Sequence, residues 1–567
     1  YNFKREYATR SFNTVYASFD IWKGIKFAST FSYDFVMNKS RAWKDPRTSD
    51  GDDDNGRFSK DYNDITNMTW SNILTYQTKI KKKHNLDLLV GYEINSKESD
   101  GLGTTISNFA RWDKPEVNNG VVYQSMGGSN STTRIVSYIT RANYDYDNKY
   151  YLGASWRTDG SSRLARENRW GNFWSLSGAW RVSSESFMKP LQNWLSDLKL
   201  RVSYGVNGTL PSSYYGYMGL SSLTSNYNDN PGITQSQLEN KELTWETNYN
   251  FNSGIDLGFF DNRLNVTFEY YVRTTKNLLY SRPLSLATGF SSYLANIGKL
   301  QNKGYELEIR STNIETKDFR WSTSLNLGHN ANKILKLDGD LKQVTSGTSI
   351  HKVDLPYSTY YMIEFAGIDP ADGEPMFYKN TTDENGNLNK ETTKDPRSAE
   401  KVILQCADPT ITGGLGNSIS YKWFDLNFNV NFSFGAWNYD GSASKLEHGG
   451  DGTLNIPIYY RKRWQKEGDE TSIERFVVGR SISMTDYATT RRLYSGDYVR
   501  LKNLTFGFTL PKTWTRKVGI DNIRLYASGN NLLTWAAYDY IDPESGSSPS
   551  WDTPPMRTYT FGLEVKF

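Results

Sequence analysis

The sequence predicts an all-β fold, namely a transmembrane antiparallel β-barrel, and three observations support this prediction. Apolar and polar side chains alternate along many segments, these segments are long, and the connections between them are short and long in turn. In the clearest segment, 424–434, Phe428 and Phe432 share one face while Asp425 and Asn429 share the other, because successive side chains of a strand point to opposite faces. One apolar face along such long strands is typical of a sheet that faces lipid.

Seventeen segments carry this alternation, and many of them have ten residues or more. Strands of soluble sheets usually have about five or six residues, whereas about nine to eleven tilted residues cross a bilayer. The predicted strands are 10–21, 25–37, 62–78, 84–98, 133–147, 149–158, 173–183, 197–208, 241–257, 262–274, 303–314, 319–330, 410–421, 424–434, 497–510, 519–530 and 556–567.

The connections between the predicted strands fall into two classes that alternate along the chain. Outer-membrane barrels have short periplasmic turns and long extracellular loops. With the long loops outside, the last strand runs inward, and we expect the C-terminus in the periplasm. The principal predicted long loops are 38–61, 99–132, 209–240, 331–409 and 435–496.

Composition argues against several other classes of protein. No run of about 20 apolar residues is present, so no membrane-spanning helix is predicted, and the 15% of aromatic residues argues against disorder. A net charge of +4 without a basic stripe gives no reason to expect nucleic-acid binding. The single cysteine excludes a cysteine-based zinc site. No nucleophile elbow, HExxH motif or phosphate-binding loop occurs, so we predict no enzymatic activity.

A large soluble β-protein, for example one that binds carbohydrate, is an alternative because its strands would also alternate. Its strands would be shorter, and its loops would not differ systematically in length. An apolar outer surface would aggregate in water, whereas in lipid only a closed barrel satisfies every backbone donor and acceptor. The membrane barrel is therefore the favoured interpretation.

Several stretches, in a fixed order along nearly the whole chain, resemble one known family. Among them are RANYDYDNKYYLGASWRTDGSSR (141–163), NIGKLQNKGYELEI (296–309), FAGIDPADGEPMFY (365–378), DPTITGGLGNSISYKWFDLNFNVNFSFG (408–435) and IRLYASGNNLLTW (523–535). Taken together they are similar to the C-terminal part of the barrel of SusC-like TonB-dependent outer-membrane transporters, the SusC/RagA family of Bacteroidetes.

The resemblance implies a barrel of 22 strands with an N-terminal plug. Residues 1–567 would then form one domain, the C-terminal portion of that barrel, embedded in the lipid of the outer membrane. Because open sheet edges are not tolerated in lipid, we expect another chain or segment to supply the missing barrel strands and the plug. The last strand ends at Phe567, and the resemblance implies that this end is the assembly signal for barrel insertion.

The resemblance also implies a function, which is TonB-dependent active import of a nutrient. The cargo would be an oligosaccharide, favoured over a peptide, held under a SusD-like surface lipoprotein that acts as a lid. The TonB complex would act through an N-terminal region outside this chain. A passive porin or a surface adhesin built on a barrel is the alternative. Aromatic clusters such as YSTYYMIEF (357–365) predict that the two longest loops fold into a cap rather than stay disordered.

Aromatic side chains in the predicted loops are the candidates for binding substrate or a partner, because sugar rings stack on aromatic faces. The same residue types form the girdle at the membrane interface, which is the favoured interpretation for those close to a strand end. The candidates are Trp43, Trp112, Tyr214, Tyr215, Tyr217, Tyr227 and Trp437.

One acidic run approaches a calcium-binding pattern. Asp50, Asp52 and Asp54 are followed by Gly56, and a calcium loop requires the order D-x-D-x-D-G. Because Asn55 occupies the position of the glycine, a solvated surface loop is the favoured interpretation, and Ca²⁺ is the weaker one. No other metal or cofactor is predicted.

Overall fold

The computed structural model describes residues 1–567 except 229, 338–340, 384–385, 451–454, 480–486, 539 and 546–553, and at 444 and 518 it describes the backbone alone. Within these residues, seventeen strands form one antiparallel sheet, and each predicted strand overlaps one of them. They are β1 (Phe3–Trp22), β2 (Ile25–Lys44), β3 (Arg57–Ile80), β4 (His84–Phe109), β5 (Gly120–Tyr146), β6 (Tyr150–Ser161), β7 (Trp170–Arg181), β8 (Leu195–Thr209), β11 (Glu246–Phe259), β12 (Leu264–Lys276), β15 (Lys299–Glu315), β16 (Phe319–Lys336), β24 (Ile411–Tyr421), β25 (Phe424–Phe434), β28 (Tyr498–Thr509), β29 (Asn522–Ala536) and β30 (Thr558–Lys566).

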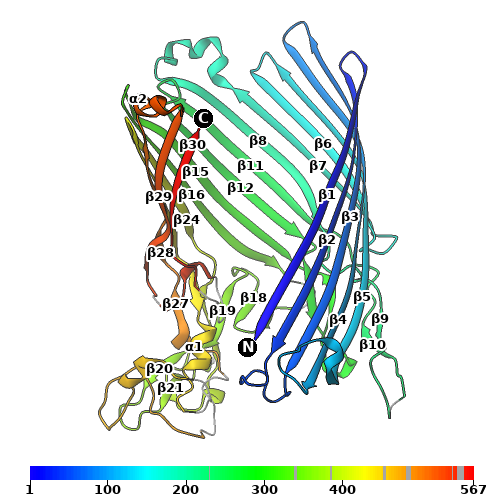
Figure 1. Cartoon of the computed structure of the whole chain (residues 1–567), viewed down its shortest axis with the longest axis vertical. Helices are drawn as coiled ribbons and strands as arrows, with labels where there is room; N and C mark the ends of the chain where they lie inside the picture. Colours follow the sequence, from blue (N-terminus) through cyan, green and yellow to red (C-terminus); the bar gives the residue numbers. More distant parts are fainter. Residues whose placement is uncertain are drawn as a thin grey trace. The chain divides into compact units, whose positions relative to one another are not determined.

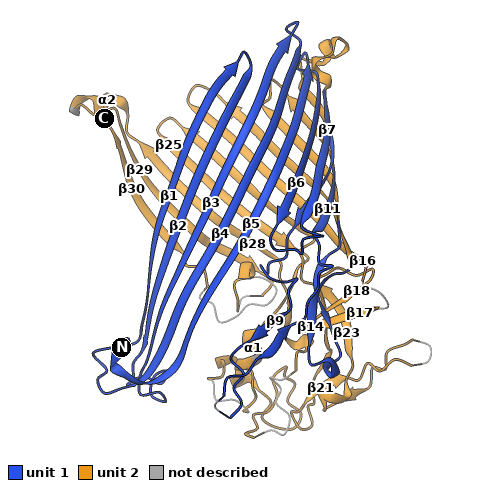
Figure 2. Cartoon of the chain, turned by 90° about the vertical axis from the view of Figure 1, so that its right-hand side faces the viewer, with its two compact units in different colours: residues 1–180, 201–251, 275–297 blue, residues 181–200, 252–274, 298–567 orange. Residues whose placement is uncertain are grey.

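The chain divides into two compact units, which Figure 2 colours separately. Unit 1 comprises residues 1–180, 201–251 and 275–297, and unit 2 comprises the remainder. Among the described residues, no helix is long and apolar enough to span a membrane.

In unit 1, β1 to β7 form a meander in which each strand pairs antiparallel with the next (Figure 1). Tight turns join the strands at one end. The turn between β1 and β2 requires a glycine, because Gly24 has a φ of +79° and a Cβ there would lie 2.2 Å from the carbonyl oxygen of Gln77.

The predicted long loops 38–61 and 99–132 are wrong in extent, because strands occupy most of them. β2 continues to Lys44 and β3 begins at Arg57, while β4 continues to Phe109 and β5 begins at Gly120. The sequence conceals these extensions because polar residues stand on both faces of β4 there, Lys97 on one face and Glu98 on the other. Backbone pairing continues where alternation has ended.

A small core closes the loop end of the first four strands of unit 1. Phe3, Trp43, Phe58 and Ile106 lie opposite one another in register across β1, β2, β3 and β4. Phe58 is fully buried, and Phe109 packs edge-on against Trp43 with ring centroids 4.9 Å apart. We call these five residues the tip core. The 3-10 helix η1 (Val117–Asn119), between β4 and β5, packs against the tip core through its first residue.

The other long connections of unit 1 share a second core. Leu164, Phe173, Leu243 and Trp245 are buried together, with the Phe173 and Trp245 rings 5.2 Å apart. Two short hairpins and a 3-10 helix belong to these connections, namely β9 (Leu220–Ser222) with β10 (Thr234–Gln237), β13 (Leu279–Pro283) with β14 (Ser292–Asn296), and η4 (Leu286–Thr288).

Unit 2 carries its own meander, in which β15, β16, β24, β25, β28, β29 and β30 pair in that order. Two connections in unit 2 hold short helical segments. The folded long loops lie at the opposite end of these strands from α2 (Figure 1). The helical turns are η2 (Val182–Ser184), η3 (Ser186–Leu191), α2 (Lys512–Thr515) and η8 (Arg516–Val518).

The two longest loops contain secondary structure of their own, as predicted for 331–409 and 435–496. The first carries a four-stranded and a three-stranded sheet, and the second carries a helix and a two-stranded pairing. The elements are β17 (Gln343–Ser346), β18 (Ser349–Lys352), β19 (Thr359–Ile363), β20 (Phe365–Ile368), β21 (Pro375–Tyr378), β22 (Thr392–Thr393), η5 (Pro396–Ser398), β23 (Lys401–Cys406), β26 (Trp437–Tyr439), α1 (Gly441–Leu446), η6 (Ile458–Lys462), η7 (Thr490–Arg492) and β27 (Leu493–Ser495); η9 (Pro543–Ser545) follows β29.

The two faces of the unit 2 sheet differ in chemistry, and this difference gives a first prediction. Phe428 lies opposite Leu504 on the apolar face, whereas Asn429 lies opposite Asn503 and lines a polar hollow of about 340 Å³. Phe428→Arg should lower the free energy of unfolding in lipid vesicles by about 2–4 kcal/mol, because the apolar face would bury the charge in hydrocarbon. Asn429→Arg is the matched control and should be nearly silent. Equal destabilisation by the two variants would contradict this assignment of the faces.

Candidate binding surface in the long loops of unit 2

The long loops of unit 2 pack around a core of their own. Tyr360 and Met362 of β19 are buried with Tyr439 of β26 and Leu493 of β27. The hydroxyl oxygen of Tyr360 accepts a hydrogen bond from the backbone N–H of Tyr439 at 3.2 Å. Segments from both long loops therefore fold together, because each supplies apolar side chains that it could not bury alone.

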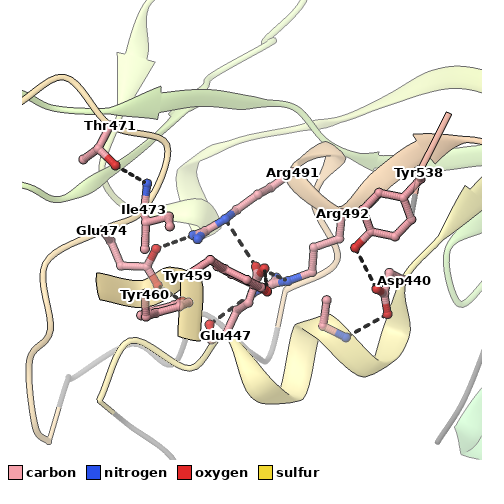
Figure 3. Close-up of polar contacts among 11 residues, drawn as sticks. Asp440, Glu447, Tyr459, Tyr460, Thr471, Ile473, Glu474, Arg491, Arg492 and Tyr538 are labelled. Carbon is pink, nitrogen blue, oxygen red and sulfur yellow. Dashed lines mark hydrogen bonds and ion pairs between the residues drawn. The ribbon is translucent and has the colours of Figure 1, made fainter. Parts of the chain in front are cut away.

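A network of buried ion pairs lies beside this core, and Figure 3 shows its members. Arg491 pairs with Glu474 and, through Nε at 3.5 Å, with Glu447. Arg492 donates from Nε to the same Glu447 carboxylate at 3.2 Å and from Nη2 to the Glu447 carbonyl oxygen at 3.2 Å. Two guanidinium groups thus balance two carboxylates. We call these four residues the buried ion network.

The buried ion network is shielded from water, which sets the strength of its interactions. The side chain of Glu474 is fully buried, and that of Arg491 is only 11% exposed. Burial alone would lower the pKa of Arg491, but the carboxylates of Glu474 and Glu447 outweigh that effect and raise it. The guanidinium therefore stays charged, and it also lies over the Phe365 ring of β20, 5.6 Å from the centroid.

Tyrosine hydroxyls complete the hydrogen bonding of the carboxylates. Tyr459 donates to Glu447 at 2.5 Å, Tyr460 donates to Glu474 at 2.9 Å, and Tyr538 donates to Asp440 at 3.0 Å. Burial and the nearby carboxylates raise the pKa of Tyr459 and of Tyr460, so both hydroxyls remain protonated donors. The other Asp440 oxygen caps α1 by accepting from the Ala443 N–H at 2.8 Å.

A chain of aromatic rings runs outward from this network. Tyr460 contacts Tyr459 at 5.9 Å between centroids, Tyr459 contacts Tyr540 at 5.5 Å, and Tyr540 contacts Tyr538 at 5.3 Å. Tyr538 stacks on Tyr494 at 3.7 Å with an interplanar angle of 9°. We call these five residues the tyrosine ladder. Exposure rises from 1% at Tyr460 to 70% at Tyr540.

The segment that carries Tyr538 and Tyr540 is fastened to the sheet just beyond them. The buried Arg500 of β28 pairs with Asp542 at 2.6 Å and with Glu544 at 2.7 Å. Lys502 adds a second pair to Glu544 at 2.6 Å. These charge-assisted contacts hold the segment that carries Tyr538 and Tyr540 against β28.

The structure corrects the prediction for Trp43. The sequence placed Trp43 in a long loop as a candidate ligand contact, but it lies in β2, is 3% exposed and belongs to the tip core. Its ring is not accessible to a ligand. The prediction failed because the absence of alternation was interpreted as the end of the strand.

Four other predicted residues serve to fix loops of unit 1. Arg47 lies over the Trp112 ring at 3.5 Å, and Arg163 lies over the Tyr214 ring at 4.3 Å. The Tyr215 hydroxyl accepts from the Thr132 N–H at 3.0 Å, and Tyr217 packs against the second core of unit 1. Trp112 is still 49% exposed, so its proposed role in binding stays a prediction.

The remaining predicted residues are spread over both units. Tyr227 is 85% exposed, and the described residues offer its ring no aromatic partner. Trp437 lies in β26 and packs partly buried against the core of the unit 2 loops. Phe567 follows β30 and is 90% exposed, and its role in assembly stays a prediction.

The acidic run of unit 1 shows no arrangement for a metal. Asp54 forms an ion pair with Arg57 at 2.5 Å, and Asp50 accepts from the Asn2 side chain at 3.1 Å, while Asp52 is exposed. Among the described residues, no three His, Cys, Asp or Glu side chains are grouped so that they could hold a metal ion. The calcium prediction therefore gains no support.

The sequence of this chain matches one known protein family over most of its length. The family described as "TonB dependent receptor-like, beta-barrel" matches residues 1–532. The chain belongs to the TonB-dependent receptor β-barrel family. TonB-dependent receptor P3 of Formosa agariphila is 32% identical over 97% of this chain and 57% of the relative. TonB-dependent receptor SusC of Bacteroides thetaiotaomicron is 30% identical over 76% of this chain and 44% of the relative.

A solved structure of a TonB-dependent receptor relative agrees with the fold. The structure of the RagAB peptide transporter has a TM-score of 0.89 and 26% identity, and the match covers 100% of this chain and 62% of that chain. The resemblance to SusC-like receptors and the predicted barrel class are thereby confirmed. The receptor chain described here spans less than two thirds of the length of these relatives.

Proposed function

We propose that this receptor chain forms part of an importer that carries a nutrient across the outer membrane, driven through TonB. The family match over residues 1–532 carries this proposal. The antiparallel sheet supports the proposal, because one of its faces is apolar and the other is polar. A membrane barrel around an aqueous lumen requires both faces. The C-terminus would lie in the periplasm, and no catalytic role is proposed.

The cargo would be an oligosaccharide or a peptide, because relatives carry the names SusC and RagAB peptide transporter. A passive porin is the alternative, and energy dependence separates the two. Uptake by cells that express the protein should cease when a protonophore collapses the proton gradient, since TonB draws on that gradient. Uptake that continues unchanged would support the porin and contradict the proposal.

We also propose that a SusD-like surface lipoprotein binds the loops of unit 2. Large apolar side chains there are exposed although the loops are folded, with Ile458 at 74% and Val478 at 80%. Contiguous patches of exposed apolar side chains mark sites of protein contact, and Ile458 and Val478 would belong to such a patch. A buried area well above about 1,200 Å² would be expected for such a lid.

The lid proposal predicts the result of a loop deletion. Tyr439 of β26 lies opposite Leu493 of β27. A two-residue turn can therefore replace residues 440–492 and leave the hairpin of β26 and β27 intact. The shortened protein should insert normally, as judged by heat-modifiable migration, but should no longer co-purify with a lipoprotein. If the lipoprotein stays bound, or never co-purifies with the intact chain, the lid proposal is wrong.

A further inference from the structure

The tyrosine ladder has the features of a built surface rather than of a chance cluster. Its inner rings are fixed, because the hydroxyls of Tyr459, Tyr460 and Tyr538 donate to three separate carboxylates. The outermost ring, Tyr540, contacts Tyr459 edge-on at an interplanar angle of 63° and Tyr538 at 52°. Tyr540 is therefore supported by two fixed rings while 70% of its surface meets water.

The charged groups that contact or fasten the tyrosine ladder are paired inside the protein. Glu447 and Glu474 are neutralised by Arg491 and its neighbour Arg492, and Arg500 of β28 pairs with both Asp542 and Glu544 in the loop after β29. Asp440 accepts from Tyr538 and from the first turn of α1. These charged groups are paired with other groups of the protein. The feature that the ladder presents to a ligand is the exposed aromatic face of Tyr540.

We propose that Tyr540, supported by Tyr459 and Tyr538, is a stacking platform for a sugar ring of a neutral oligosaccharide. A sugar ring presents a face of C–H groups, which the electron-rich face of an aromatic ring attracts. A fixed ring binds with a smaller loss of conformational entropy than a mobile one. This inference rests on the proposed import function and assigns its cargo a place in the loops of unit 2.

The test measures binding of defined sugars to the protein purified in detergent from its membrane. Isothermal titration with maltohexaose, cellohexaose, xylohexaose and mannohexaose should find at least one that binds. Tyr540→Ala should weaken that binding about tenfold, the loss expected for one aromatic contact with its buried area. Tyr540→Phe and Tyr540→Trp should preserve binding, because the ring face and not the hydroxyl makes the contact. Trp514→Ala removes an exposed ring in α2, at the opposite end of the unit 2 strands from these loops (Figure 1), and should change nothing.

Three outcomes would overturn the platform. They are unchanged binding by Tyr540→Ala, equal loss in Tyr540→Phe, and a panel in which short neutral peptides bind but no oligosaccharide does. The protonophore experiment keeps this failure separate from failure of the import proposal. Energy-dependent uptake without ring-dependent sugar binding would reject the platform alone, whereas ring-dependent binding with energy-independent uptake would reject import alone.

Discussion

Replacing Arg491 with methionine is expected to destabilise the folded loops of unit 2 by about 3–5 kcal/mol. Arg491 is the residue shared by Glu474 and Glu447. Its removal leaves the fully buried Glu474 carboxylate without a counter-ion, and the cost of an uncompensated buried charge exceeds the value of the pair itself. The tyrosine ladder should loosen as well, because Tyr460 and Tyr459 hydrogen-bond to the same two carboxylates.

Hydrogen exchange of the backbone amides measures this effect locally. Amides of α1 and η6 should lose protection in Arg491→Met, while those of β24 and β25 should not. Arg461→Met is the matched control, because Arg461 is exposed in η6. The double variant Arg491→Met with Glu474→Met should recover part of the loss, since it removes both charges. Equal protection in the Arg491 and Arg461 variants would show that the buried ion network does not stabilise the loops.

The second large effect is expected at the tip core. Phe58→Ala should cost about 3–5 kcal/mol, the usual range for removing a buried phenylalanine, because Phe58 has no exposed surface. Tyr62→Ala is the control, since Tyr62 lies further along β3 on the same face but is 39% exposed. Denaturant unfolding in detergent, followed by the intrinsic fluorescence of the tryptophans, should show the difference. A loss no larger than that of Tyr62→Ala would contradict the role assigned to this core.

Much of the fold could be predicted because the alternation reports the environment directly. Wherever a strand separates an apolar from a polar environment, as β25 does at Phe428 and Asn429, the pattern located the strand within a few residues. Where both faces of a strand are polar, as near Lys97 and Glu98, the pattern carried no information and the predicted ends fell short.

The candidate surface was harder to predict, because contacts between distant segments create it. Aromatic composition identified loops rich in possible ligand contacts, but composition cannot show which rings are buried, as Trp43 illustrates. The tyrosine ladder joins residues from three segments, and the buried ion network brings Glu447 beside Arg491. No local sequence pattern predicts a contact between segments that lie so far apart in the sequence. The closely spaced tyrosines at 459 and 460 and at 538 and 540 were the available indications.

The length of β4 and β5 has a consequence for how the chain finds its register. These strands have 26 and 27 residues, which at about 3.3 Å per residue amounts to roughly 85 Å of strand. Tilted by about 45°, they rise roughly 60 Å, twice the hydrocarbon thickness of about 30 Å. The tight turns and the lipid-facing alternation fix the register of the half that crosses the bilayer. In the half that stands in water, a local slip of one residue absorbed by a bulge would move no apolar side chain out of lipid, so the bilayer would not correct it. The tip core can, because Phe58 meets Ile106 in one alignment of β3 and β4. The alignment of the outer half of these strands is therefore held by the tip core, at the end farthest from the tight turns, where one cluster joins four strands.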